Sequence, residues 1–162
     1  MLMERASFGA GCFWGIEEVF RTTKGVIATE VGYMGGSTEN PIYEQICTDE
    51  TGHAEVVQLE FDPRQITYEQ LLSIFWKNHN PTTPNRDGPN EGTQYRSAIF
   101  YQNEVQKQLA ERVTKQVNAS GKWKSAVTTQ IVTADKFYAA EDYHQDYLVN
   151  HPGGYTCHYL RE

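Results

Sequence analysis

Strand-like and helix-like hydrophobic patterns follow one another along this chain in the order β-α-β-β-α-β, with a further helix and strand behind them. This order is typical of the split βαβ plan, in which helices cover one face of a mostly antiparallel sheet. We therefore predict an α+β fold, a ferredoxin-like two-layer sandwich with long loops and an irregular C-terminal tail. The predicted strands span residues 7–12, 25–33, 55–62, 96–101 and 126–133, and the predicted helices span residues 14–21, 67–79, 103–118 and 137–150.

The most regular of these helices spans residues 67–79. Its first residues, Thr67 and Gln70, fit a capping box, in which each side chain bonds the backbone amide of the other residue. Apolar residues then recur at the spacing of one helix face: Tyr68, Leu71, Leu72, Phe75 and Trp76. The helix at 103–118 is expected to start at the cap Asn103 and to bury a side made of Val105, Leu109, Val113 and Val117.

Length and charge limit the possible classes of protein. The chain has 162 residues, about the length of one domain, and contains no recognisable linker, so we predict a single domain over residues 1–162. The net charge of −7 argues against binding to nucleic acid or to an anionic membrane. No apolar stretch approaches the roughly 18 residues of a spanning helix, and the N-terminal residues do not resemble a signal peptide. We expect a cytoplasmic monomer.

The three cysteines are too few and too widely spaced for a disulfide scaffold, which directs attention to reactive thiols. Cys12 stands between the end of a predicted strand and the first turn of a predicted helix. Unpaired amides and the helix dipole stabilise a thiolate at such a position. The flanking glycines allow a ligand to come close to the backbone. The alternative interpretation is a structural cysteine beside the core aromatics Phe13 and Trp14.

Five motifs occur in sequence along the chain: Gly11-Cys-Phe-Trp-Gly15, Gly32-Tyr-Met-Gly-Gly36, Asn40-Pro-Ile-Tyr43, Thr51-Gly-His-Ala-Glu55 and Gly92-Thr-Gln-Tyr-Arg-Ser97. With these motifs the chain resembles the peptide methionine sulfoxide reductases of the A type over nearly its whole length. The resemblance implies a thiol-dependent reduction of methionine S-sulfoxide, free or in proteins, to methionine. Such an enzyme repairs oxidised proteins under oxidative stress.

The resemblance also implies a role for each residue that acts on the sulfoxide. Cys12 is the nucleophile that attacks the sulfur and becomes a sulfenic acid. Glu55 is the acid that protonates the leaving oxygen. Tyr43 and Tyr95 bind the same oxygen, for which a phenol is suited because it donates a hydrogen bond without bringing a charge.

Two further features concern substrate binding. Phe13 and Trp14 match the apolar wall that receives the S-methyl group of the substrate. One position departs from the family, because the chain reads Gly-Pro-Asn-Glu-Gly from residue 88 where most members carry Gly-x-Asp-x-Gly. Asn90 therefore takes the aspartate position. Either its amide keeps the hydrogen-bond network of the site, or Glu91 substitutes for the lost carboxylate.

A second thiol can reset the oxidised nucleophile by forming a disulfide with it. By resemblance this thiol is Cys157, in a glycine-containing tail over residues 150–162 that we expect to be mobile. Thioredoxin or another external dithiol would reduce the disulfide, and no bound cofactor is implied. Cys47 could act as a second relay thiol, although a structural role is favoured. The histidines lack the spacing of a strong metal site, so we expect no metal.

Two other functions stay open at this point. A Cys-His hydrolase or acyltransferase would pair Cys12 with His53 and would turn over without a reductant. A non-catalytic split βαβ module that binds peptides would have no use for a redox-active thiol pair. His53 precedes Glu55 by two residues, and it could either orient that carboxyl group or bond to the backbone of a loop.

Overall fold

The computed structural model describes residues 3–11, 13–48, 50–79, 81–82, 85–87, 90–120, 123 and 127–150, with only the backbone at residues 86, 87, 90 and 91. The predicted nucleophile Cys12 and the predicted recycling residue Cys157 lie outside the described residues. The same holds for residues 151–162 of the predicted tail.

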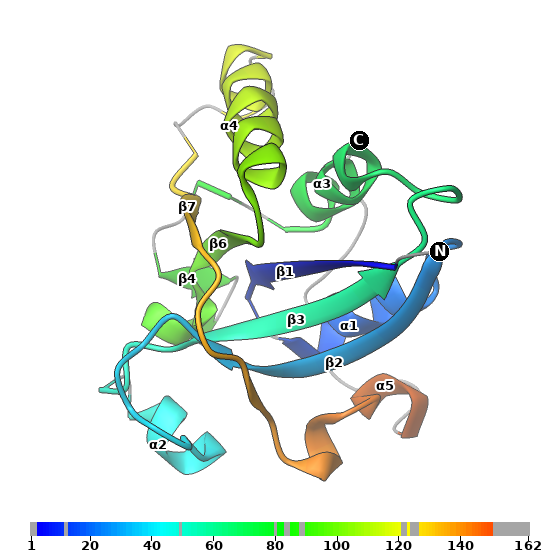
Figure 1. Cartoon of the computed structure of the whole chain (residues 1–162). Helices are drawn as coiled ribbons and strands as arrows, with labels where there is room; N and C mark the ends of the chain where they lie inside the picture. Colours follow the sequence, from blue (N-terminus) through cyan, green and yellow to red (C-terminus); the bar gives the residue numbers. More distant parts are fainter. Residues whose placement is uncertain are drawn as a thin grey trace.

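Six strands form one sheet in the order β7-β6-β1-β3-β2-β8 (Figure 1). Along the order β6-β1-β3-β2-β8, every pair of neighbouring strands is antiparallel. The edge strand β7 pairs with β6 in parallel. The predicted α+β fold with split βαβ topology is confirmed. The strands of this sheet are β1 (Glu4–Ala10), β2 (Val26–Met34), β3 (Ala54–Phe61), β6 (Ser97–Tyr101), β7 (Gln130–Thr133) and β8 (Tyr138–Ala139), and a separate hairpin is made of β4 (Arg86–Asp87) and β5 (Asn90–Glu91).

The helices are α1 (Phe13–Arg21), α2 (Tyr43–Cys47), α3 (Tyr68–Lys77), α4 (Glu104–Ala119) and α5 (Tyr147–Asn150), with 3-10 turns η1 (Thr93–Tyr95) and η2 (Asp142–His144). Alternate residues of β1 and β3 form the main core with α1 and α3, because side chains of a strand point to its two faces in turn. At its centre Phe8 stacks on Phe20, Tyr68 and Phe75, with ring centroids 5.4, 6.0 and 5.2 Å away.

The two predicted helix caps are confirmed. The hydroxyl of Thr67 accepts a hydrogen bond from the amide of Gln70 at 3.1 Å, and the Thr67 amide donates to Oε1 of Gln70 at 2.9 Å. At the start of α4, Oδ1 of Asn103 accepts from the amide of Gln106 at 2.9 Å. Among the described residues, no helix is both long and apolar enough to cross a membrane.

The predicted buried side of α4 is wrong at its first position. Val105 is 65% exposed, whereas Gln106 and Ala110 are buried. The reason is that the Gln106 side chain donates a hydrogen bond to the backbone carbonyl of Arg5 at 2.8 Å. This bond orients the first turn of α4 so that Gln106, and not Val105, faces β1. Farther along the helix the other predicted apolar residues do pack against the core, half-buried: Leu109, Val113 and Val117.

The helix predicted over residues 137–150 is also wrong. This segment consists of β8, the 3-10 turn η2, a residue with left-handed backbone at Asp146 (φ 51°), and the single turn α5. Hydrogen bonds to strand β2 take the place of helical hydrogen bonds in this segment. Ala140 donates to the carbonyl of Val31 at 2.9 Å, and the side chain of Gln145 bonds both the amide and the carbonyl of Val31, at 2.9 and 2.8 Å. The strand before it, β7, starts at Gln130, four residues later than predicted.

The chain between β7 and β8 crosses the face of the sheet that lies opposite α1 (Figure 1). Ala134 and Phe137 pack there on a second apolar cluster formed by Met34, Ala54, Val56, Ala98 and Phe100. The close approach needs a glycine at position 32, because a Cβ at this residue would lie 2.3 Å from the carbonyl oxygen of Tyr138. This crossing carries the C-terminal segment to the β2 edge, next to the start of α1.

Candidate active site

The first turn of α1 meets a buried carboxyl group from β3. Glu55 is 2% exposed, and its Oε1 accepts a hydrogen bond from the amide of Phe13 at 3.2 Å. Glu55 has this place because it pairs with Tyr33 across β2 and β3 and lies on the same face as the core residues of its strand. Cys12, which precedes Phe13 in the chain, lies outside the described residues.

The two predicted oxygen-binding tyrosines come from separate short helical segments, since Tyr43 starts α2 and Tyr95 ends η1, and they lie within electrostatic range of one another. Burial and then the nearby charge of Glu55 raise the pKa of Tyr43 above its ordinary value, and Tyr95 acts in the same direction. Cys47, an exposed residue one helical turn later in α2, raises the pKa of Tyr43 further. The Tyr43 phenol therefore keeps its proton at neutral pH and can donate a hydrogen bond. Tyr43 thus lies close enough to Glu55 and Tyr95 for both to influence its pKa.

An aromatic wall stands beside this group. Phe13 and Trp14, predicted as the apolar wall, are joined by His144, which is fully buried and lies 5.2 Å from the Phe13 ring between centroids. The indole Nε1 of Trp14 donates to Nδ1 of His144 at 2.9 Å, and the ring of Tyr147 stacks on Trp14 at 3.9 Å. The Tyr43 ring lies 4.5 Å from His144. Burial lowers the pKa of His144, so the ring is neutral at physiological pH.

Glu141 links the segment that contains His144 to Tyr33 and Tyr43. Its carboxylate accepts from the hydroxyl of Tyr33 at 3.0 Å and from the amide of Tyr43 at 2.9 Å. Burial alone would raise the pKa of Glu141, but the hydrogen bonds from Tyr43 and Tyr33 and the influence of His144 hold it below the ordinary value. Glu141 is thus ionised, and it fixes the first residue of α2 against β2.

Sequence reasoning missed four residues of this arrangement: Tyr33, Glu141, His144 and Tyr147. Three of them lie in the segment that was predicted to be a helix. A signal was present, because residues 141 to 147 are acidic, aromatic or polar and form no continuous apolar stripe. Such a stretch cannot bury one face as a helix, and it is more typical of a segment that lines a site.

His53 does not orient Glu55 but holds a loop. Its Nδ1 accepts from the amide of Gly36 at 3.0 Å, so Nε2 carries the proton and donates to the carbonyl of Thr38 at 2.6 Å. Of the two alternatives raised above, the bond to loop backbone is therefore the one observed. Because both ring nitrogens are engaged in this way, His53 is not available as the base of a Cys-His hydrolase.

The remaining predicted residues have partial descriptions. Asn90 begins β5 and pairs with Asp87 in β4, but its side chain is not among those described. Within the described part of the chain, no three histidine, cysteine, aspartate or glutamate residues gather in a way that could hold a metal ion.

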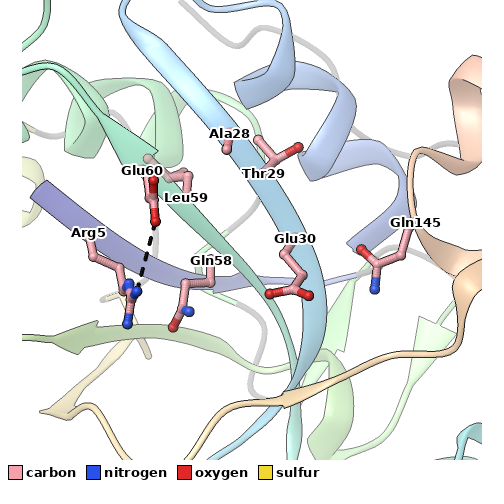
Figure 2. A pocket seen from close by; sticks show the side chains of 8 residues that line it. All are labelled: Arg5, Ala28, Thr29, Glu30, Gln58, Leu59, Glu60 and Gln145. Carbon is pink, nitrogen blue, oxygen red and sulfur yellow. Dashed lines mark ion pairs between the residues drawn. The ribbon is translucent and has the colours of Figure 1, made fainter. Parts of the chain in front are cut away.

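One surface depression lies away from these groups, over strands β1, β3 and β2 (Figure 2). It has a volume of about 400 Å³ and is lined by Arg5, Ala28, Thr29, Glu30, Gln58, Leu59, Glu60 and Gln145. The ion pair that it contains, between Arg5 and Glu60, is 3.8 Å long and half exposed, so it is worth little. The depression offers no buried acid or thiol, and the candidate site is the one at α1.

The chain is similar to known proteins over nearly its whole length. A family model described as peptide methionine sulfoxide reductase matches residues 4–162. The peptide methionine sulfoxide reductase MsrA of Methanosarcina acetivorans is 56% identical over 146 residues, which are 90% of this chain and 78% of that protein. That of Methanothermobacter thermautotrophicus is 52% identical over 158 residues, 98% of this chain and 93% of that protein. Crystalline Mxr1 from Saccharomyces cerevisiae in reduced form has a TM-score of 0.93 at 35% identity, covering 99% of this chain and 93% of its own.

Proposed function

This chain belongs to the peptide methionine sulfoxide reductase family and reduces methionine sulfoxide, and we propose that Cys12 and Glu55 carry the reaction. The observation that supports these roles is the hydrogen bond from the Phe13 amide to Glu55, since Phe13 directly follows Cys12 in the chain. This bond places the buried carboxyl group of Glu55 against Phe13, the residue that follows Cys12. A sulfoxide oxygen is a poor leaving group until it is protonated, so the reaction needs an acid there.

The chemical step consumes a thiol and a sulfoxide. The Cys12 sulfur forms a bond to the substrate sulfur while Glu55 protonates the oxygen, and Tyr43 and Tyr95 donate hydrogen bonds to that oxygen. The hydroxyl group then passes from the substrate sulfur to the Cys12 sulfur while the bond between the two sulfurs breaks. Methionine leaves with its sulfur reduced, and Cys12 is oxidised to a sulfenic acid that carries the oxygen. The raised pKa of Tyr43 supports its role, because a phenol that stays protonated remains a donor throughout the reaction.

We further propose that the accepted epimer is the S-sulfoxide. The oxygen must point toward Glu55, Tyr43 and Tyr95 while the methyl group lies against Phe13 and Trp14, and only one arrangement about the sulfur satisfies both. The other epimer would leave buried donors unpaired, which costs free energy. When resolved methionine sulfoxide diastereomers are supplied with dithiothreitol, the S form should be consumed and the R form should persist. Comparable rates for the two would contradict this pocket.

The proposed recycling step uses Cys157. Its thiol condenses with the Cys12 sulfenic acid, which forms a disulfide and releases water, and an external dithiol then reduces the disulfide. Thioredoxin is the proposed reductant, and the solved complex of the yeast protein Mxr1 with Trx2 supports this choice. We propose that the enzyme acts as a cytoplasmic monomer on free and protein-bound sulfoxide, with the recycling cysteine on a mobile tail of a single domain.

Replacing Cys157 with alanine separates the chemical step from recycling. We expect this variant to release one methionine per enzyme in a burst and then to stop in the presence of thioredoxin, because the sulfenic acid forms but lacks its partner. Methionine is counted by rapid quench, and the wild-type chain without reductant is analysed by peptide mapping for a disulfide between residues 12 and 157. Sustained turnover of the variant with thioredoxin would move the recycling role to Cys47 or to direct attack by the reductant.

A further inference from the structure

The chain turns sharply between the two rings that the C-terminal segment supplies to the aromatic wall. His144 ends the turn η2, Tyr147 starts α5, and Asp146 between them has a φ of 51°. A residue with a Cβ rarely adopts this left-handed conformation, which persists only where the surroundings hold it. The amide of Asp146 donates to Oε1 of Glu17 at 2.8 Å.

The carboxyl group of Glu17 is buried, and removing its charged form from water costs free energy. It lies on α1, one turn after the start of the helix, and is 1% exposed. Its second oxygen accepts from the hydroxyl of Thr29 in β2 at 3.1 Å. In Figure 2 the Thr29 side chain points from β2 toward α1, and Gln145 reaches toward β2 from the C-terminal segment. Nothing in the chemistry proposed above uses Glu17, and its two partners belong to two different elements.

We propose that Glu17 is a positioning residue for the reductase site: by binding the amide of Asp146 it holds the turn that places His144 and Tyr147 against Trp14. The inference rests on the proposed role of Trp14 in receiving the substrate. Gln145, which bonds the backbone of Val31 at 2.9 and 2.8 Å, holds the same turn from its other side. The two attachments join one turn of the C-terminal segment to α1 and to β2.

The attachment through Glu17 depends on pH. Burial raises the pKa of Glu17 to about 7, the carboxylate of Asp146 acts in the same direction, and the bonds from Asp146 and Thr29 and the charge of Arg21 act against it. When the turn opens, Glu17 becomes solvated and its pKa returns toward about 4.3. The closed turn thus binds the proton more tightly, so protonation favours closing and rising pH favours opening. His144 and Glu141 lie on the same segment and can also change charge with pH. Every variant used below keeps both residues, so their contribution to the pH dependence is the same in all of them.

The test compares Glu17→Ala and Glu17→Gln with a matched control, Glu18→Ala. Glu18 is the next residue of α1, and its carboxylate pairs with Arg21 on the surface. Two quantities are measured for each chain: KM and kcat for a methionine sulfoxide peptide with dithiothreitol, and hydrogen exchange over residues 143–150 by mass spectrometry. We expect Glu17→Ala to raise KM about tenfold with a smaller change in kcat, and to raise exchange in this segment but not in β1 and β3.

Glu17→Gln keeps an acceptor oxygen and should stay within about threefold of the wild-type KM, as should Glu18→Ala. Between about pH 6 and pH 8, exchange of residues 143–150, corrected for its intrinsic rate, should rise about tenfold in the wild-type chain and stay level in Glu17→Gln. If Glu17→Ala fails to fold, Glu17→Leu takes its place, because leucine fills the buried space but has no acceptor for the Asp146 amide. Glu17→Gln, which has a similar size and keeps an acceptor oxygen, is its control.

The inference is overturned if Glu17→Ala leaves both KM and exchange at wild-type values, if exchange rises while KM does not, or if Glu17→Gln is as impaired as Glu17→Ala. In the fallback pair, equal KM values for Glu17→Leu and Glu17→Gln would have the same meaning. Failure of the proposed function would be seen separately, as a wild-type chain that forms no methionine under conditions in which its exchange pattern is intact.

Discussion

Glu55→Gln should slow sulfoxide reduction by about 10²- to 10⁴-fold, the usual contribution of a positioned general acid. Glutamine keeps the shape of the side chain and can still accept the hydrogen bond that Glu55 receives from the Phe13 amide. It has no acidic proton to give to the sulfoxide oxygen. We therefore expect the rate of the first turnover, measured by rapid quench, to fall while KM stays close to the wild-type value.

Glu60→Gln provides the matched control. Glu60 lies on the same strand, but it is exposed, and its partner is Arg5 at 3.8 Å on the opposite face of the sheet. An exposed pair of this kind contributes little to stability, so this variant should behave as the wild-type chain does. A Glu55→Gln effect confined to KM would show that Glu55 binds the substrate and does not supply the proton.

Cys12→Ser should abolish methionine formation. A serine hydroxyl is barely ionised at neutral pH, whereas a thiol at the start of a helix is deprotonated more easily and is a softer nucleophile for sulfur. The expected result is no methionine above background in a single-turnover assay, and no sulfenic acid detectable with a dimedone-type probe.

Cys47→Ser controls for the loss of a thiol in general. Cys47 is exposed at the end of α2, and serine is close to cysteine in size and polarity. This variant should therefore still form one methionine per enzyme in the absence of reductant. Turnover by Cys12→Ser above a few per cent of wild type would remove Cys12 from the role of nucleophile, whatever the result for Cys47→Ser.

The parts of the fold that were predicted correctly are those governed by local periodicity and capping. The helix α3 carries both its capping box and its apolar stripe within ten consecutive residues, so nothing distant is needed to specify it. The alternation in β3 likewise places Val57, Leu59 and Phe61 on one face. The errors at Val105 and over residues 137–150 have a common cause. At both places a side-chain amide, from Gln106 or Gln145, bonds the backbone of a strand far away in the sequence.

The sequence by itself determined the reaction through its five motifs, because these resemble the motifs of the A-type peptide methionine sulfoxide reductases and the family model matches residues 4–162. Their common location was decided by the tertiary structure. Glu55 reaches the start of α1 because β1 and β3 are neighbours in the sheet. The members of the site that no motif announced, Glu141, His144 and Tyr147, enter it because the chain crosses the sheet to the β2 edge and is held there by Gln145 and Glu17. Such contacts join residues more than one hundred positions apart, and their free energy depends on packing that no local pattern encodes.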